Sequence, residues 1–172
     1  AMALAAGASF DAIVSGLHHA RPVAGRQVMM QLGNQAILID DSYNANPGSV
    51  TAAIDALVTA CALDKKSSAL VLGDMAELGG AAEVMHYQIG MYAKSRGIQQ
   101  LFACGALSLA TCNGFGEGAQ YFLTQQALIE SLVQNVSSEQ RLLVKGSRSS
   151  QMDKVVNKLV TTFSLKETPN AS

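Results

Sequence analysis

Short apolar runs and longer stripes of helical period alternate along most of the chain. The apolar runs are three to six residues long, and each precedes a polar or glycine-containing loop. They lie at residues 35–40, 69–72, 100–104, 120–122 and 141–144. Between them, apolar residues recur at spacings of three and four, as on one face of an amphipathic helix. Strands that alternate with helices in this way predict an α/β domain with a mostly parallel sheet and helices on both faces.

The helices are placed by their start and stop signals. Asn46 followed by Pro47 marks the N-terminus of a helix, whose apolar stripe is Val50, Ala53, Ile54, Leu57, Val58 and Cys61. Further helices are expected over about residues 81–95, ending before Gly97, after a cap at Thr124, and along the final stripe between residues 152 and 163. The small-residue region 105–118 gives no firm assignment and leaves room for a short helix.

The start of the chain departs from the alternating pattern. Ser9 can cap a short helix over residues 10–17, and Pro22 closes that segment. Residues 26–32 and 35–40, joined by a turn at Gly33-Asn34, predict a β-hairpin and so one antiparallel strand. We therefore expect residues 1–20 to be the end of a preceding element, residues 21–165 to form the domain, and residues 166–172 to be a frayed polar tail.

Composition narrows the class of protein. The 172 residues suit one domain, and 49% of them are hydrophobic, which allows a sizeable core. A net charge of -1 gives no footprint for nucleic acid or an anionic membrane, and no apolar run reaches the ~20 residues that span a bilayer. The three cysteines form no CxxC pair, so we expect free thiols in the cytoplasm and no metal site in this domain.

Three polar loops follow predicted strands, at residues 40–46, 73–80 and 145–149. The carboxyl ends of parallel strands meet at one edge of a sheet, where open α/β domains bind their ligands. Residues far apart in the sequence are therefore expected to converge on one crevice.

The first loop has the residue types of a nucleoside site. Asp41 can accept hydrogen bonds from ribose hydroxyls, Tyr43 offers a flat face for stacking, and Asn44 and Asn46 can read the edge of a base. The alternative is that these side chains only satisfy turn and N-cap donors, which we favour for Asn46 alone but not for the whole run.

The other two loops carry charges. Asp74 and Glu77 could bind an ammonium group or a metal-bound water. Alternatively they belong to a solvated loop with Glu77 near a helix N-terminus, and spacing alone does not separate the functional interpretation from the structural one. His86 lies in the next helix. A lone histidine at such a position more often has a structural role than a functional one.

Lys145, Ser147 and Arg148 precede a helix start and suit a phosphate or carboxylate, against the alternative of two solvated cations. Arg26 is ambiguous on its own. The chain lacks GxxxxGK[ST], a GxGxxG fingerprint after a strand, and a GxSxG elbow, so it has no recognisable centre for phosphate transfer.

Four motifs in this order resemble the C-terminal domain of the Mur ligases. They are Gly25-Arg26, DDSYNANP at residues 40–47, GDMAELG at residues 73–79 with His86 after it, and LVKGSR at residues 143–148. The resemblance runs from about Pro22 to Phe163, and the DDSYNANP form is most similar to the type that adds D-alanyl-D-alanine to UDP-N-acetylmuramoyl-tripeptide.

The resemblance implies a Rossmann-like domain of an ATP-dependent amide ligase that makes a peptidoglycan precursor through an acyl phosphate. In such enzymes a central domain carries the P-loop and holds ATP and Mg²⁺, and the C-terminal domain packs against it. Carried over, Arg26, Asp41, Tyr43, Asn44 and Asn46 would bind ATP. The dipeptide and reacting centre would be faced by Asp74, Glu77, His86, Lys145, Ser147 and Arg148.

This chain lacks the P-loop, so the resemblance further implies that the fragment alone is inactive. Two other interpretations stay open from the sequence: a free-standing module that binds a nucleoside or metabolite, and a sibling Mur ligase that adds a different amino acid.

Overall fold

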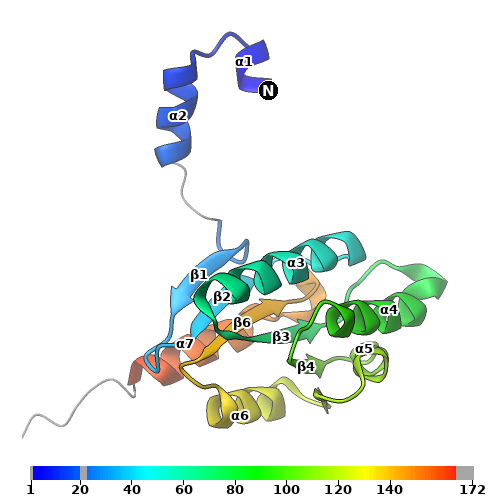
Figure 1. Cartoon of the computed structure of the whole chain (residues 1–172). Helices are drawn as coiled ribbons and strands as arrows, with labels where there is room; N and C mark the ends of the chain where they lie inside the picture. Colours follow the sequence, from blue (N-terminus) through cyan, green and yellow to red (C-terminus); the bar gives the residue numbers. More distant parts are fainter. Residues whose placement is uncertain (1, 20–22, 166–172) are drawn as a thin grey trace, which may run out of the picture.

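A six-stranded sheet forms the centre of the domain in the computed structural model, which describes residues 2–19 and 23–165 (Figure 1). The strand order is β1-β2-β6-β3-β4-β5, and only the β1–β2 pair is antiparallel. The strands are β1 (Val28–Gln31), β2 (Ile37–Asp41), β3 (Ser67–Gly73), β4 (Gln100–Cys104), β5 (Ala119–Phe122) and β6 (Gln140–Lys145). This confirms the mostly parallel sheet with one antiparallel strand.

Helices cover both faces of the sheet, as expected. One face packs against α3 (Pro47–Asp64), α4 (Ala82–Ser95) and α5 (Ser108–Phe115), and the other against α6 (Gln125–Asn135) and α7 (Asp153–Leu165). The chain also forms α1 (Met2–Ala5), α2 (Phe10–His19) and the short 3₁₀ turns η1 (Gly79–Ala81) and η2 (Arg148–Ser150).

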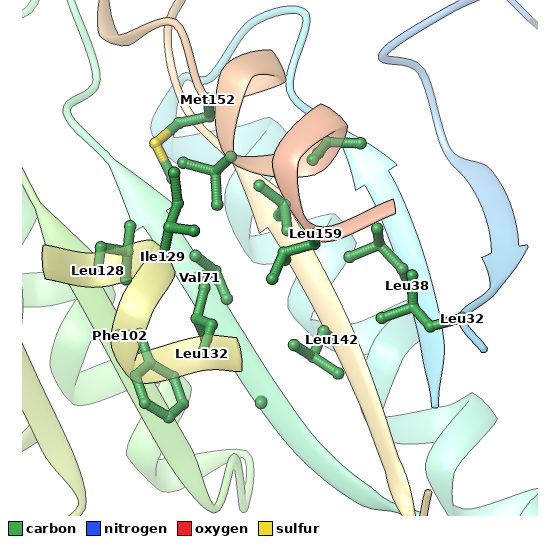
Figure 2. Close-up of a cluster of buried hydrophobic side chains, with 14 of the residues drawn as sticks. Leu32, Leu38, Val71, Phe102, Leu128, Ile129, Leu132, Leu142, Met152 and Leu159 are labelled. Carbon is green, nitrogen blue, oxygen red and sulfur yellow. The ribbon is translucent and has the colours of Figure 1, made fainter. Parts of the chain in front are cut away.

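Alternation along the central strands explains the two cores. Val71, Phe102 and Leu142 point toward α6 and α7 and join a cluster that includes Met152 and Leu159 (Figure 2). Their neighbours Leu70, Leu101 and Leu143 point the other way, toward α3, α4 and α5. Because both faces of these strands are apolar, the sequence shows continuous hydrophobic runs rather than alternation.

The start of α3 forms as its sequence predicts. The Asn46 side chain accepts a hydrogen bond from the Ser49 amide, the Ser49 hydroxyl accepts one from the Asn46 amide, and Pro47 is the first helical residue. This capping box satisfies backbone donors that the first turn leaves free, which is typically worth about 1 kcal/mol. It also fixes where the loop from β2 ends.

The region that the sequence left unassigned contains α5. Its glycine, Gly114, and Gly90 of α4 allow the two helices to cross closely, because a Cβ on either would collide with a carbonyl oxygen of the other helix. Small residues that weaken the periodic signal therefore have a packing reason here.

The N-terminal segment carries α1 and α2, the two helices that precede the first strand. The Ser9 hydroxyl accepts a hydrogen bond from the Ala12 amide, so the expected cap of α2 is confirmed, and the helix runs two residues beyond the expected end. Among the side chains described at residues 2–16, none belongs to either cluster. The expected stop at Pro22 and the polar tail lie outside the described residues. No helix in the described ranges is long and apolar enough to cross a membrane.

Candidate functional site

On both sides of β6, the loops at the carboxyl ends of neighbouring strands lead to opposite faces of the sheet. The connections that leave β2 and β3 run to α3 and α4 on one face, whereas the connection that leaves β6 runs to α7 on the other. Loops that part in this way leave a crevice at the carboxyl ends of the strands. Two cavities of about 450 and 470 Å³ lie there, and the three polar loops converge on them as expected.

The first cavity lies between the β2 loop, β6 and the start of α3. Small side chains of α3 form its floor, because Ala52 and Ala56, one helical turn apart, leave the space open. The full lining is Arg26, Gln27, Asp41, Tyr43, Asn44, Asn46, Ser49, Ala52, Ala53, Ala56 and Lys145. All five residues expected to bind a nucleotide are therefore brought together in one cavity.

A buried ion pair stands at the inner end of this cavity. Asp41 and Lys145 are register partners on the parallel strands β2 and β6, and their side chains are 13% and 3% exposed. Lys145 Nζ lies 2.6 Å from Asp41 Oδ2 and donates a second hydrogen bond to the Asn44 carbonyl at 2.9 Å. The other carboxylate oxygen, Asp41 Oδ1, accepts from the Gln27 amide at 3.3 Å.

The mouth of the cavity carries a cation–π pair. The Arg26 guanidinium lies 4.2 Å from the centroid of the Tyr43 ring. Gly25 and Gln27 on either side of Arg26 have φ values of +73° and +52°, and the Gly25 carbonyl accepts a hydrogen bond from the Tyr43 amide at 2.9 Å. This tight turn is why a pair seventeen residues apart in sequence can stack, an interaction worth about 0.5–1 kcal/mol at an exposed site.

The second cavity shares a wall with the first and lies between the β2, β3 and β6 loops. Asn44 and Asn46 line both cavities, so residues 44–46 form the wall. Glu77, Ser147 and Arg148 line only the second. Three of the residues expected on the reacting-centre side are therefore brought together.

The charged groups of the second cavity are loosely held. Arg148 is 71% exposed and its nearest carboxylate oxygen, on Asp153, is 3.8 Å away. Glu77 is exposed and has a φ of +63°, a left-handed conformation that favours glycine. Ser147, by contrast, is buried, and its amide donates to the Asp74 carbonyl at 2.9 Å.

The other three residues expected on that side lie elsewhere. Lys145 belongs to the first cavity, because β6 extends to it and the pleat turns it toward Asp41 rather than toward Ser147 and Arg148. The Asp74 carboxylate accepts hydrogen bonds from the Leu107 amide at 3.1 Å and the Ser108 hydroxyl at 2.6 Å, and so satisfies donors at the start of α5.

His86 is fully buried beneath the β3 loop and lines neither cavity. Its Nε2 accepts a hydrogen bond from the Met75 amide at 3.0 Å, and Nδ1 donates to the Ala82 carbonyl at 2.8 Å. Both ring nitrogens are used by the backbone, which agrees with the structural role that a lone helical histidine usually has. His86 holds the loop that carries Glu77 and does not reach the cavity itself.

Comparison with known proteins identifies the family of this chain. A model of the Mur ligase glutamate ligase domain matches residues 25–148, most of the chain. The chain belongs to the Mur ligase family. It is 41% identical over 163 residues to the UDP-N-acetylmuramoyl-tripeptide–D-alanyl-D-alanine ligase of Escherichia coli K12, a match that covers 92% of this chain and 34% of the relative.

Solved Mur ligase structures share the fold. MurF from Acinetobacter baumannii superposes with a TM-score of 0.82 at 30% identity, over 92% of this chain and 35% of that one. MurF from Thermotoga maritima, solved with ADP, gives a TM-score of 0.79 at 18% identity, over 96% of this chain and 36% of that one, which shows a common fold. The chain thus spans about a third of the length of the relatives it matches.

Sequence reasoning missed several lining residues of this Mur ligase domain. Gln27 and Ser49 were not singled out, although Ser49 lies three residues after an N-cap, where a capping box has its second member. Ala52 and Ala56 of α3 were not singled out either. Their signal was the exposed pair Ala52 and Ala56 beside a polar loop, where a solvated helix face usually carries larger side chains.

The described residues offer no group of three or more histidines, cysteines or carboxylates placed to hold a metal ion. A magnesium ion is typically held by carboxylates together with substrate phosphates. Such a site would need ligands beyond those that the described residues of this domain bring together.

Proposed function

We propose that this domain is the C-terminal part of an ATP-dependent amide ligase that joins D-alanyl-D-alanine to UDP-N-acetylmuramoyl-tripeptide in the cytoplasm. The observation that carries the proposal is the 41% identity to the Escherichia coli ligase of that name over 92% of this chain. Because the match covers a third of that relative, the sugar-peptide substrate, the P-loop and magnesium would belong to other domains.

The first cavity would hold the nucleoside part of ATP. Its volume of about 450 Å³ falls in the range of small-molecule sites. An ionised carboxylate has about four lone-pair positions, so Asp41 can accept from ribose hydroxyls while it keeps its contacts to Lys145 and Gln27. Tyr43 and Arg26 would lie along a base, with Asn44 and Asn46 at its edge.

The second cavity would receive the dipeptide beside the reacting carboxyl group. Arg148 offers a guanidinium for a carboxylate, and Glu77 offers a carboxylate for an ammonium, and the two line one cavity. A dipeptide has one group of each kind. In the proposed reaction, the amine of the dipeptide attacks an acyl phosphate of the tripeptide, and phosphate leaves as the amide forms.

The test uses the full-length protein that contains this domain. We expect phosphate release that requires ATP, the UDP-tripeptide and D-alanyl-D-alanine together, and none from residues 1–172 alone. Asp41→Ala should mainly raise the apparent KM for ATP. A preference for a single amino acid over the dipeptide would assign a sibling ligase activity, and an unchanged KM would remove Asp41 from the ATP site.

A further inference from the structure

Lys145 is one of the most enclosed charged side chains among the described residues, and it is not used as a free cation. The residue is 2% exposed, and its ammonium group donates to Asp41 Oδ2 at 2.6 Å and to the Asn44 carbonyl at 2.9 Å. An ammonium group has three donors, so at most one remains for anything else. A solvated or phosphate-binding lysine would instead extend into open space.

We propose that Lys145 is a positioning residue that fixes the two cavities relative to each other, acting through Asp41 and the Asn44 carbonyl rather than by touching the nucleotide phosphates. This inference rests on the proposed function, since it assigns how the nucleotide side of that site is kept in shape.

The position of Lys145 in the sheet explains why it can do this. Lys145 ends the strand β6, between β2 and β3, and is the register partner of Asp41 on one side and of Leu72 on the other. Leu143, two residues earlier, packs on the α3 side of the sheet. Side chains two residues apart in a strand share a face, so Lys145 and Asp41 both rise toward the floor of the first cavity.

Through its two contacts, Lys145 connects the Asp41 carboxylate to the wall between the cavities. Asp41 carries the carboxylate that would meet the ribose, whereas Asn44 begins the wall that both cavities share. Without the ammonium, the Asp41 carboxylate would be nearly buried without its charge partner, and the Asn44 carbonyl would lose the donor that holds the wall. Both changes occur at Asp41 and Asn44, in the lining of the first cavity.

A double-mutant cycle tests the proposal on this chain. Asp41→Asn, Lys145→Met and the double variant are titrated by NMR with adenosine and, separately, with ADP. Lys158→Met, an exposed lysine of α7 outside both cavities, is the matched control. We expect Lys145→Met to weaken binding by about tenfold, and by the same factor for adenosine and for ADP, since charged hydrogen bonds are typically worth that much.

The outcomes separate the possible roles. A loss for ADP with adenosine unchanged would mean that Lys145 touches phosphate, and would overturn the proposal. If Lys145→Met does not fold, the double variant removes both buried charges, and its loss relative to Asp41→Asn must again be equal for the two ligands.

A readout without ligand keeps the inference separate from the proposed function. The Ala45 amide shares a peptide group with the Asn44 carbonyl, and its hydrogen exchange should be faster in the double variant than in Asp41→Asn. Unchanged exchange would overturn the positioning role. If the wild-type chain binds neither adenosine nor ADP but the Ala45 amide responds as expected, the proposed nucleotide site fails while the role of Lys145 in the wall stands.

Discussion

The two cavities are neighbours of nearly equal volume, but they are built in different ways. In the first, the charges are paired in the interior: Lys145 and Asp41 are 3% and 13% exposed and 2.6 Å apart. In the second, Arg148 is 71% exposed and 3.8 Å from its partner, and Glu77 stands on an exposed loop. A preformed first cavity can recognise a ligand without reorganising, whereas the second leaves its charges for a ligand to order.

The largest difference should appear when one cation of each cavity is removed. Lys145→Met should lower the free energy of unfolding by about 3 kcal/mol, because it leaves a nearly buried carboxylate unpaired. Arg148→Met should change it by less than about 0.5 kcal/mol, because its pair is solvated. Urea denaturation of both variants gives the comparison. Equal losses would mean that the two cavities are not built differently.

Two thiols in the core on the α3 side of the sheet limit the pH range of such measurements. Burial raises the pKa of the Cys61 and Cys112 thiols from 9.0 to about 11. The fold thus favours the neutral thiols, and this contribution, on the order of 2 kcal/mol for each, is complete below pH 9 and is lost as pH rises toward 11. Urea denaturation under reducing conditions should show this loss.

The matched variant for this pH effect is the pair Cys61→Val and Cys112→Ala, which should flatten the decline between pH 9 and about 11. A decline of the same size in that variant would assign the pH effect to other groups.

Filling the first cavity should separate its shape from its charges. Ala56→Leu puts a good helix former on an exposed position of α3 and should keep the fold, but its side chain would occupy the cavity floor. We expect adenosine affinity to fall by about tenfold or more, since lost shape complementarity removes contact area and polar contacts together.

Ala62→Leu is the control, because Ala62 is exposed on the same helix and lines neither cavity. Calorimetry or NMR titration of both variants decides the matter. An unaffected Ala56→Leu variant would place the ligand elsewhere.

The smallest effect is expected at the rim of the second cavity. Glu77→Gly relieves a left-handed backbone at φ +63° and should raise the free energy of unfolding by up to about 1 kcal/mol. In the full-length protein the same change should raise the KM for the dipeptide, because a carboxylate is lost. A stability gain with an unchanged KM would mean that Glu77 does not face the dipeptide.

The sequence predicted most of the fold because its local signals agree with one another. Asn46-Pro47, Thr124 and Gly97 marked helix ends, and runs such as 69–72 marked strands buried on both faces. The sequence did not assign the helix α5, because its glycine, Gly114, interrupts the periodic apolar pattern. This glycine is needed where α5 crosses α4 closely. That crossing is a tertiary fact that no local window contains.

The sequence predicted which loops form the candidate site, but not which side chains contact one another within it. That loops 40–46, 73–80 and 145–149 meet follows from parallel strands. Lys145 faces Asp41 because of the β2–β6 register and because β6 ends at Lys145, one residue beyond the apolar run 141–144. The sequence pattern specifies neither of these. Asp74 and His86 have the residue types of a site, but their polar atoms are used by nearby backbone and by Ser108.

The wall at residues 44–46 has a consequence for the design of inhibitors. A separator only one chain segment thick means that two fragments, seated in the two cavities, would lie near enough for a short linker. Joining them makes the second binding event intramolecular, so that two weak compounds can gain affinity without any new contact. Because Lys145 anchors the Asn44 end of the wall, the linker is better routed over its Asn46 end, toward α3.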